Sequence, residues 1–401
     1  MTAPTTAPVQ DKTARLTPKL AIDLRQYGIL AALVVIILLF QMLTGGRLLM
    51  PGNVNNLIQQ NSYVLILAIG MVMVIIAGHI DLSVGSVVAV VGAIAALAMN
   101  QWHLPWWLAV LLALVVGAAI GAWQGFWIAY VEIPAFIVTL AGMMLFRGLT
   151  LILLTGGTIG GLPPEFIAIG AGWLPPALGA IGKLDVLTLA LGVVACVGLV
   201  FQQLSTRAGR RRNRLPVEGV AVFWGRIAIA VLAIMALAWR LADYSGTPII
   251  LIILAVLILA YSFVLNRTVF GRHVYALGGN LFAAIMSGVK TKRVNFLLFV
   301  NMGVLAALAG VVSTARAGSA VASAGQNYEL DAISSVFIGG AAVQGGVGTV
   351  VGAVIGGLVM GVLNMGLSIL SVDAAWQMAI KGLVLLLAVA FDLVNKRRSG
   401  R

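Results

Sequence analysis

Long apolar runs separated by short polar segments recur along most of the chain. A helix needs about 20 mostly apolar residues to span a bilayer. Several runs are shorter than this or rich in glycine, so some must be merged and others broken. We therefore predict an all-α polytopic membrane protein with about ten transmembrane helices, including broken or re-entrant segments. The runs are 27–43, 62–77, 84–99, 104–122, 124–146, 184–201, 219–239, 248–265, 294–312, 332–344, 350–370 and 376–394.

One polar segment, residues 266–293, contains a short apolar helix of its own. Asn280 is placed to cap a helix over residues 281–287, and Gly288 is placed to end it. This helix is too short to cross a bilayer, and its large apolar side chains recur at i,i+4 spacing on adjacent faces. The segment carries five basic residues and no acidic residue. We expect an apolar helix in such a loop to dock against a partner.

The composition supports a membrane protein. Of 401 residues, 61% are hydrophobic and only 9% are charged, which excludes a soluble core. The net charge of +13 does not indicate nucleic-acid binding, because the basic residues cluster beside apolar runs as the positive-inside rule requires. The clusters lie before the first run, in 207–214, in 266–293 and at the C-terminus. We predict that all four, and hence both termini, are cytoplasmic.

This pattern gives a single transmembrane domain, residues 27–394, with its polar loop at 266–293. Residues 1–26 are expected to form a disordered cytoplasmic tail, and residues 395–401 a cytoplasmic C-terminal tail. Residues 155–183 are rich in Gly and Pro, and they are expected to form a short extracytoplasmic cap. Whether they re-enter or span the membrane is left open.

The sequence carries no enzymatic signature. No GxxxxGK[ST] motif occurs, so the chain is not expected to hydrolyse ATP by itself. No nucleophile–base set and no metal-ligand spacing is present, so no catalytic residue, metal site or bound cofactor is predicted. Most glycines, such as Gly117, Gly121 and Gly125 at intervals of four, are expected to let helices approach closely.

The segment 78–86 interrupts two apolar runs with polar residues. Asp81 and Ser83 are each placed to cap a helix that begins near Val84. An ionisable residue at membrane depth is alternatively a candidate for a translocation path. Both interpretations stay open here. His79 has no neighbouring ligand residue and is expected to be hydrogen-bonded rather than metal-bound.

A second break, residues 325–331, loosely resembles the first one. Glu329 and Asp331 precede small residues and an apolar run, which again fits either helix capping or a translocation path. Two similar breaks are compatible with an internal pseudo-repeat. Arg147 lies within an apolar run and must snorkel or find a partner, for which Glu132 is a candidate. Lys381 is expected to be an interfacial residue.

Several segments resemble the permeases of bacterial monosaccharide ABC importers of the ribose/xylose type. The similar segments run in order from about residue 53 to residue 370, and the added length at 155–245 resembles the xylose or multiple-monosaccharide branch. His79 stands where many relatives have a small residue, which argues against a general role for it. The similar segments are 78–86, 133–140, 147–149, 271–280, 283–284 with 287–289, 328–333, 339–340 and 345–349.

The resemblance implies a transport subunit and not an enzyme. It implies a homodimer in the bacterial inner membrane, a cytoplasmic ATPase partner that uses ATP and Mg, and a periplasmic sugar-binding protein. The coupling segment would map onto residues 271–288. The residues that carry it are Gly271, Arg272, Tyr275, Asn280, Phe282, Ala283, Ala284, Ser287 and Gly288.

The expected function is therefore import of a monosaccharide, with xylose or a related pentose or hexose as the substrate. The alternative is a secondary sugar transporter driven by protons or sodium, with Asp81, Glu329 or Asp331 as its coupling carboxylate. Such a self-contained transporter has no need of a docking helix at 281–287. The particular sugar and the pore-lining residues are left undecided by the sequence.

Overall fold

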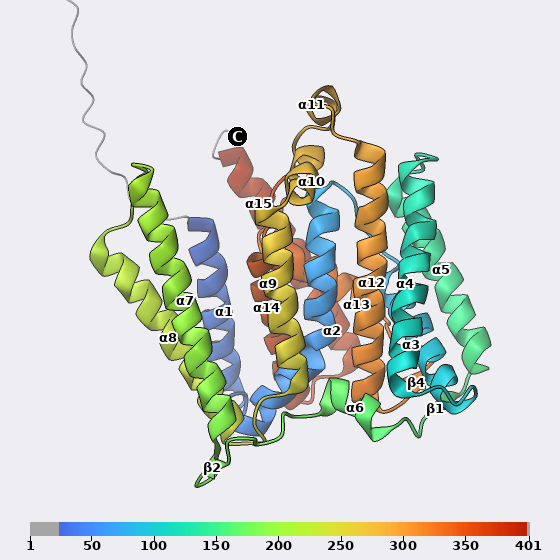
Figure 1. Ribbon diagram of the computed structural model, residues 1–401, viewed down its shortest axis with the longest axis horizontal. Coiled ribbons are helices and arrows are strands. Elements are labelled where there is room, and N and C mark those ends of the chain that lie inside the picture. Colours follow the sequence, from blue (N-terminus) through green and yellow to red (C-terminus); the bar gives the residue numbers. More distant parts are fainter. Residues whose placement is uncertain (1–23, 399–401) are drawn as a thin grey trace, which may run out of the picture.

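The computed structural model describes residues 24–398, so residues 1–23 of the predicted N-terminal tail and residues 399–401 lie outside the described part. Within that part the chain is almost entirely helical (Figure 1). The helices are α1 (Leu24–Leu43), α2 (Pro51–Ile76), α3 (Val84–Asn100), α4 (Trp106–Ala129), α5 (Ala135–Leu154), α6 (Pro164–Ala171), α7 (Val186–Arg212), α8 (Val220–Ala242), α9 (Ile249–Arg267), α10 (Val269–Gly279), α11 (Leu281–Met286), α12 (Thr291–Ala317), α13 (Tyr328–Ile338), α14 (Val350–Ile369) and α15 (Ala374–Arg398). Four short strands, β1 (Thr158–Ile159), β2 (Ala180–Ile181), β3 (Leu184–Asp185) and β4 (Ala320–Val321), form the antiparallel pairs β1–β4 and β2–β3.

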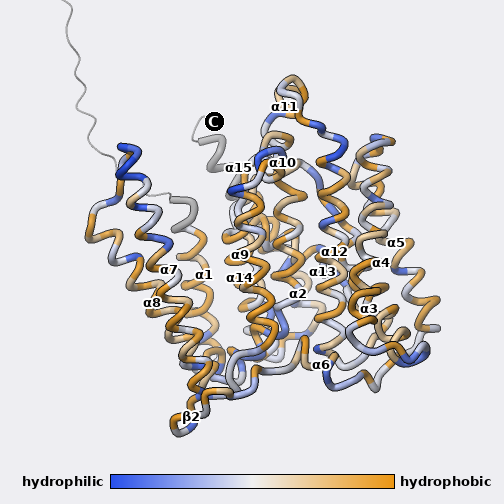
Figure 2. The backbone as a smooth tube through the Cα atoms, viewed as in Figure 1, coloured by the Kyte–Doolittle hydropathy of each residue, from blue (hydrophilic) through white to orange (hydrophobic). Residues whose placement is uncertain are grey.

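The all-α polytopic class is confirmed. Among the described helices, eight are long and apolar enough to cross a membrane, namely α2, α4, α5, α7, α8, α9, α12 and α14. Three shorter apolar helices, in α1, α3 and α15, accompany them. Figure 2 shows hydrophobic residues along the helix bodies and hydrophilic stretches at the upper end of α7 and between α11 and α12.

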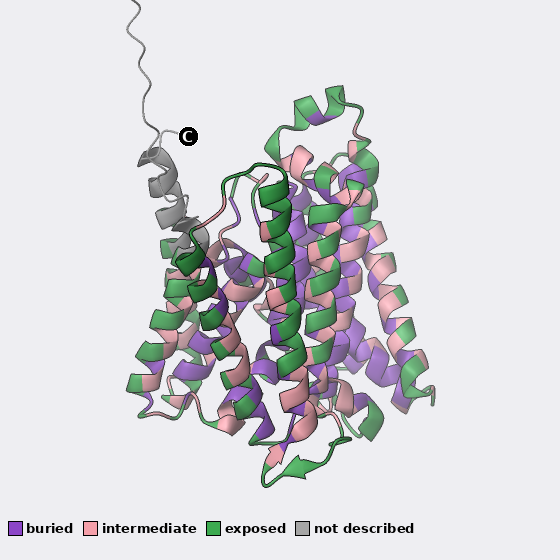
Figure 3. Cartoon of the chain, turned by 60° about the vertical axis from the view of Figure 1, so that its left-hand side comes forward, coloured by how far each residue is buried: buried purple, intermediate pink, exposed green. Residues whose placement is uncertain are grey.

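The centre of the bundle is built by α2, α3 and α12. The apolar part of α2 is 89% buried, whereas that of α8 is only 11% buried, and Figure 3 shows the contrast between buried centre and exposed outer helices. Helix α12 packs closely against α4, as the glycine spacing predicts. At this contact Gly117 and Gly121 of α4 lie against the backbone of Gly303, with no room for a Cβ atom. Small residues here let the two backbones approach closely.

Helices α7 and α8 form a hairpin at one side of the bundle, near α1 in Figure 1. Asp185 caps α7 by accepting a hydrogen bond from the Thr188 backbone N–H at 2.9 Å. The Thr188 hydroxyl is also hydrogen-bonded to Thr247 at 2.9 Å. Near this end the Tyr244 ring packs beside Gly52 of α2. These contacts attach the hairpin to the bundle at the end opposite α11 (Figure 1).

Residues 155–183 contain no helix long enough to span a membrane. They form β1, the eight-residue α6 and β2, and they lie across the end of the bundle opposite α11 (Figure 1). Gly170 of α6 packs directly on the backbone of α12. The segment therefore covers one end of the bundle and does not span it.

Candidate functional site

The first break separates α2 from α3 and is ordered by Asp81. This carboxylate is only 2% exposed, and its Oδ1 accepts hydrogen bonds from the Ser83 backbone N–H at 2.8 Å and the Ser83 hydroxyl at 2.6 Å. Gln124 of α4 donates to Ser83 Oγ at 2.7 Å. Helix α3 begins at Val84 as predicted, but Ser83 makes no capping bond with its side chain. Asp81 instead stabilises the turn just before the helix.

The second break precedes α13, and it meets the first one. Asn327 has a left-handed backbone with φ +63°, and Glu329 and Asp331 lie in the first turn of α13. The Glu329 carboxylate lies directly over Gly85 in the first turn of α3, and the backbones of Gly85 and Gly325 are in contact. The fold thus places Asp81, Ser83 and Glu329 around the start of one helix.

Arg147 of α5 holds the second break in place. Its guanidinium donates to the carbonyl oxygens of Ala324 at 2.6 Å and Ala322 at 3.4 Å. Backbone carbonyl oxygens, like carboxylates, can pair with a partly buried cation. The suggestion that Glu132 is the partner of Arg147 is wrong, because Glu132 forms an exposed ion pair with Lys292 at 2.7 Å.

Asp331 does not join the group around α3. Side chains two positions apart on a helix differ in direction by about 200°. Asp331 therefore points away from Glu329 and toward α2 and α15. Lys381 lies 3.2 Å from its Oδ1, and the Tyr63 hydroxyl donates to its Oδ2 at 3.5 Å. Lys381 was expected at the membrane interface without a partner, and this ion pair supplies one. The Tyr63 ring stacks on Tyr328 at 3.7 Å between centroids.

Tyr63, Gln124 and Tyr328 also belong to these clusters, although they were not predicted as members. Tyr63 and Gln124 lie within long apolar helices. A single polar or aromatic residue there forms no repeating pattern that would identify it as part of a site. His79, by contrast, is hydrogen-bonded as predicted, with its Nε2 3.2 Å from Asn295 Oδ1. Within residues 24–398 no three His, Cys, Asp or Glu side chains come close enough to hold a metal ion.

The predicted docking helix exists as α11 and projects from the end of the bundle (Figure 1). Asn280 caps it by accepting a hydrogen bond from the Ala283 backbone N–H at 2.9 Å, and Gly288 follows it with φ +79°. Four large apolar side chains are between 45% and 72% exposed, while Ala284 is buried at 5%. The exposed side chains are those of Leu281, Phe282, Ile285 and Met286.

Helix α10, which precedes α11, is firmly seated on the bundle. Thr268 caps it, and Gly271 lies against the carbonyl oxygens of Val264 and Leu265. Gly278 similarly leaves no room for a Cβ atom beside the Ile76 carbonyl at the end of α2. The Tyr275 hydroxyl donates to the Gly348 carbonyl at 2.7 Å, and burial raises the pKa of this phenol. Helix α10 therefore connects α11 to a close contact with α2.

The remaining residues of the predicted coupling segment lie on its outer surface. Arg272 of α10 and Ala283 of α11 are exposed, and so are Ser287 and Gly288 after α11. The Ser287 hydroxyl donates back to the Ala283 carbonyl at 2.8 Å and closes the end of α11. The segment thus combines closely packed glycines, Gly271 and Gly278, with an exposed apolar surface.

The chain is similar to sugar permeases over nearly its whole length. It is 40% identical to the xylose transport system permease protein XylH of Haemophilus influenzae over 378 residues, which cover 94% of this chain and 98% of that protein. Its identity to XylH of Escherichia coli K12 is also 40%, over 94% of both chains. The ribose import permease protein RbsC of Bacillus subtilis is 36% identical over 85% of both chains. No solved structure gives a significant match.

These similarities confirm the resemblance seen in the motifs. They also fit a transport subunit rather than a catalytic enzyme. The family match extends from the first turn of α2 into α15, over residues 53–389, and so includes both breaks and the coupling segment. The chain therefore belongs to the permease family described as branched-chain amino acid transport system / permease component.

Proposed function

We propose that this chain is the transmembrane subunit of an ATP-driven importer that carries a monosaccharide, preferably xylose, into the cytoplasm. The observation that carries the proposal is the 40% identity to a xylose transport permease over 98% of that protein. A periplasmic binding protein delivers the sugar, and two copies of this chain form the pathway in the bacterial inner membrane. Specificity then lies mostly in the binding protein.

The energy comes from a separate cytoplasmic ATPase that binds ATP and Mg, while this chain binds no cofactor. The exposed apolar surface of α11 supports docking of that partner, since an apolar helix in a groove is a common recognition mode. The buried seat of α10 against α2 supports transmission of its movement. Coupling requires that the partner bind the two conformations of the permease differently.

The orientation follows from charge. The basic end of α7, the segment 266–293 and the end of α15 lie toward the same end of the bundle as α11 (Figure 1). The positive-inside rule therefore favours a cytoplasmic location for α11 and for both termini. The caps β1 and α6 then face the periplasm, where a sugar-binding protein docks.

The pathway is proposed to pass the junction of the two breaks. Asp81, Ser83 and Glu329 surround the start of α3, where interrupted helices offer polar groups at membrane depth. Asp331 is paired with Lys381, so we assign it a stabilising role beside the pathway. In the alternating-access cycle, closure of the ATPase pair moves α11 and rearranges the two permease copies.

Uptake of labelled xylose in membrane vesicles tests the proposal against a proton- or sodium-driven transporter. The vesicles contain the permease with its ATPase and binding protein, and an ionophore collapses the ion gradients. We expect uptake to continue with ATP and to stop with a non-hydrolysable ATP analogue. Uptake that stops with the gradient and ignores ATP overturns the importer proposal. Competition by ribose measures how far the sugar preference extends.

A further inference from the structure

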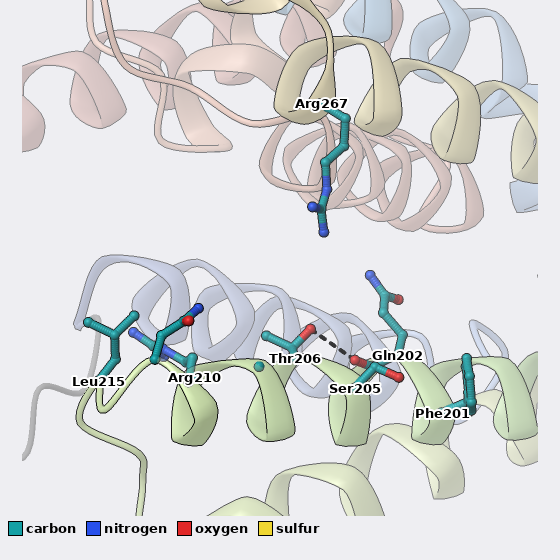
Figure 4. Close-up of a pocket in the computed structure, with 9 residues that line it drawn as sticks. Phe201, Gln202, Ser205, Thr206, Arg210, Leu215 and Arg267 are labelled. Atoms are coloured by element: carbon teal, nitrogen blue, oxygen red, sulfur yellow. Dashed lines mark hydrogen bonds between the residues drawn. The ribbon is translucent and has the colours of Figure 1, made fainter.

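A basic cleft lies between the end of α7 and the end of α9. It has a volume of about 520 Å³ and opens to the outside of the bundle. Figure 4 shows Arg267 reaching from the end of α9 across this space toward α7. The facing side of α7 presents Phe201, Gln202, Ser205, Thr206 and Arg210.

The charged residues that line the cleft are all basic. No acidic residue lines it, and the guanidinium groups of Arg210 and Arg267 have no hydrogen-bond or ion-pair partner among residues 24–398. The neighbouring acid Glu218 is already occupied, since it pairs with Arg226 at 2.9 Å. Arg207 donates to the Glu218 carbonyl at 3.0 Å and lies over the Phe223 ring. Arg210 and Arg267 are therefore the two cations available to a ligand.

Apolar side chains continue from the cleft toward the membrane interior. On α7, Val194, Val197 and Phe201 recur at helical spacing and are 67%, 63% and 72% exposed. On α9, three further apolar residues share the face of Arg267 at spacings of three and four, and each is at least 60% exposed. They are Val256, Leu259 and Phe263. Both helices thus present an apolar stripe that ends at an arginine.

We propose that this cleft binds an anionic phospholipid of the cytoplasmic leaflet. The phosphate lies between Arg210 and Arg267, the headgroup hydroxyls meet the polar side chains of α7, and the acyl chains run along the two apolar stripes. Basic pockets between transmembrane helices on the cytoplasmic side are typical sites for anionic headgroups. The lipid thereby fills the open side between the α7–α8 hairpin and α9. This site is independent of the sugar pathway.

The apolar stripes distinguish a lipid from a soluble anion. Free phosphate needs only the two guanidinium groups and gains nothing from Phe201 or Phe263. A second copy of the chain is also disfavoured, because two copies would bring together the same strongly basic ends of α7. The combination of two cations above two apolar stripes matches the division of a phospholipid into headgroup and chains.

Native mass spectrometry of the purified full-length chain in detergent tests the proposal. The chain is titrated with phosphatidylglycerol, and with phosphatidylcholine for comparison. Removing both cations in Arg210→Gln/Arg267→Gln is expected to weaken phosphatidylglycerol binding about thirtyfold, at about fivefold per charge. The matched control Arg211→Gln/Arg212→Gln also removes two charges, both from the last turn of α7 that holds Arg210. Neither Arg211 nor Arg212 lines the cleft. It is expected to change binding less than about threefold.

Three results overturn the proposal. Equal weakening by the two double variants means that only general surface charge attracts the lipid. Binding of glycerol phosphate as tight as that of the whole lipid means that the acyl chains contribute nothing. Rapid disulfide formation between two copies of Gln202→Cys means that a second chain covers the cleft. The variant Phe201→Ser, which keeps both arginines, is expected to weaken lipid binding but to leave glycerol phosphate binding unchanged.

Discussion

Gly85 and Gly325 are in direct backbone contact, and neither has room for a Cβ atom beside the other. Gly325 also has a left-handed backbone with φ +69°. These two glycines join the start of α3 to the loop before α13. Their contact brings Asp81, Ser83 and Glu329 together. The contact explains why two segments 240 positions apart in the chain (325 − 85) act as one structural unit.

Gly85→Ala is predicted to separate the two breaks. The added methyl group collides with the Gly325 carbonyl and the Glu329 carboxylate, so we expect a loss of about 1–3 kcal/mol of stability. Thermal unfolding in detergent measures this loss, and sugar uptake measures its effect on the pathway. Gly148→Ala in α5 is the matched control, because a Cβ atom there meets no other atom within 4 Å. Equal stability of the two variants contradicts the tight contact.

Arg147→Met is predicted to loosen the loop before α13. It removes the hydrogen bond to the Ala324 carbonyl at 2.6 Å, and a hydrogen bond from a charged group contributes about 1.5–3 kcal/mol. We expect a lower unfolding temperature and faster proteolysis near Ala324. Arg47→Met serves as the control, since the Arg47 side chain is exposed. Unchanged proteolysis in Arg147→Met contradicts the assigned role.

Lys381→Met is predicted to leave the Asp331 carboxylate without its cation. Breaking a fully buried pair costs about 3–5 kcal/mol. The Lys381 side chain is 24% exposed, so we expect a smaller loss of about 2 kcal/mol because solvent screens the pair. Adding Asp331→Asn to this variant should restore most of the stability. A double-mutant cycle on the unfolding free energy measures the coupling, and zero coupling contradicts the pair.

The sequence could predict what depends on neighbours along the chain. The cap at Asn280, the end at Gly288 and the start of α3 at Val84 follow from local residue order, and the structure contains all three. The membrane class follows from the long apolar runs. The partners of the candidate site residues depend on contacts between distant segments, so they were largely not predictable from one sequence.

Two residues show this limit. Arg147 was expected to snorkel or to find a partner, with Glu132 as a candidate, but its acceptors are carbonyl oxygens of a loop 175 and 177 positions later. Lys381 was expected to lie at the membrane interface, and no partner was predicted for it, yet α15 brings it to Asp331. In both cases the tertiary fold supplies a partner that residue type and spacing do not specify.

The exposed pair Glu132–Lys292 is predicted to add stability only above acidic pH. The hydrogen bond from Lys292 and its positive charge lower the pKa of Glu132 below the ordinary value of 4.5. The contribution is complete above pH 4.5 and is lost as pH falls through the lowered pKa. The stability difference between the wild type and Glu132→Gln should therefore disappear in acid. A difference that grows as the pH falls contradicts this sign, and added salt should reduce the difference at neutral pH.

Phe282→Asp is predicted to abolish co-purification of the ATPase without unfolding the permease. Phe282 is 72% exposed, so a carboxylate there costs the isolated chain little but places an unpaired charge in an apolar interface. Ala284→Arg is a less clean test, because Ala284 is only 5% exposed and its replacement disturbs α11 itself.

The matched control for Phe282→Asp is Trp102→Asp, whose side chain is 55% exposed in the loop after α3. Asn100, two residues before Trp102, is hydrogen-bonded to Gly160 beside β1, at the end opposite α11 in Figure 1. This variant adds the same charge to an exposed aromatic position and should retain the ATPase. Both variants should unfold at the temperature of the wild type. Retention of the ATPase by Phe282→Asp removes α11 as the docking surface, whereas its loss in both variants points to a general assembly defect.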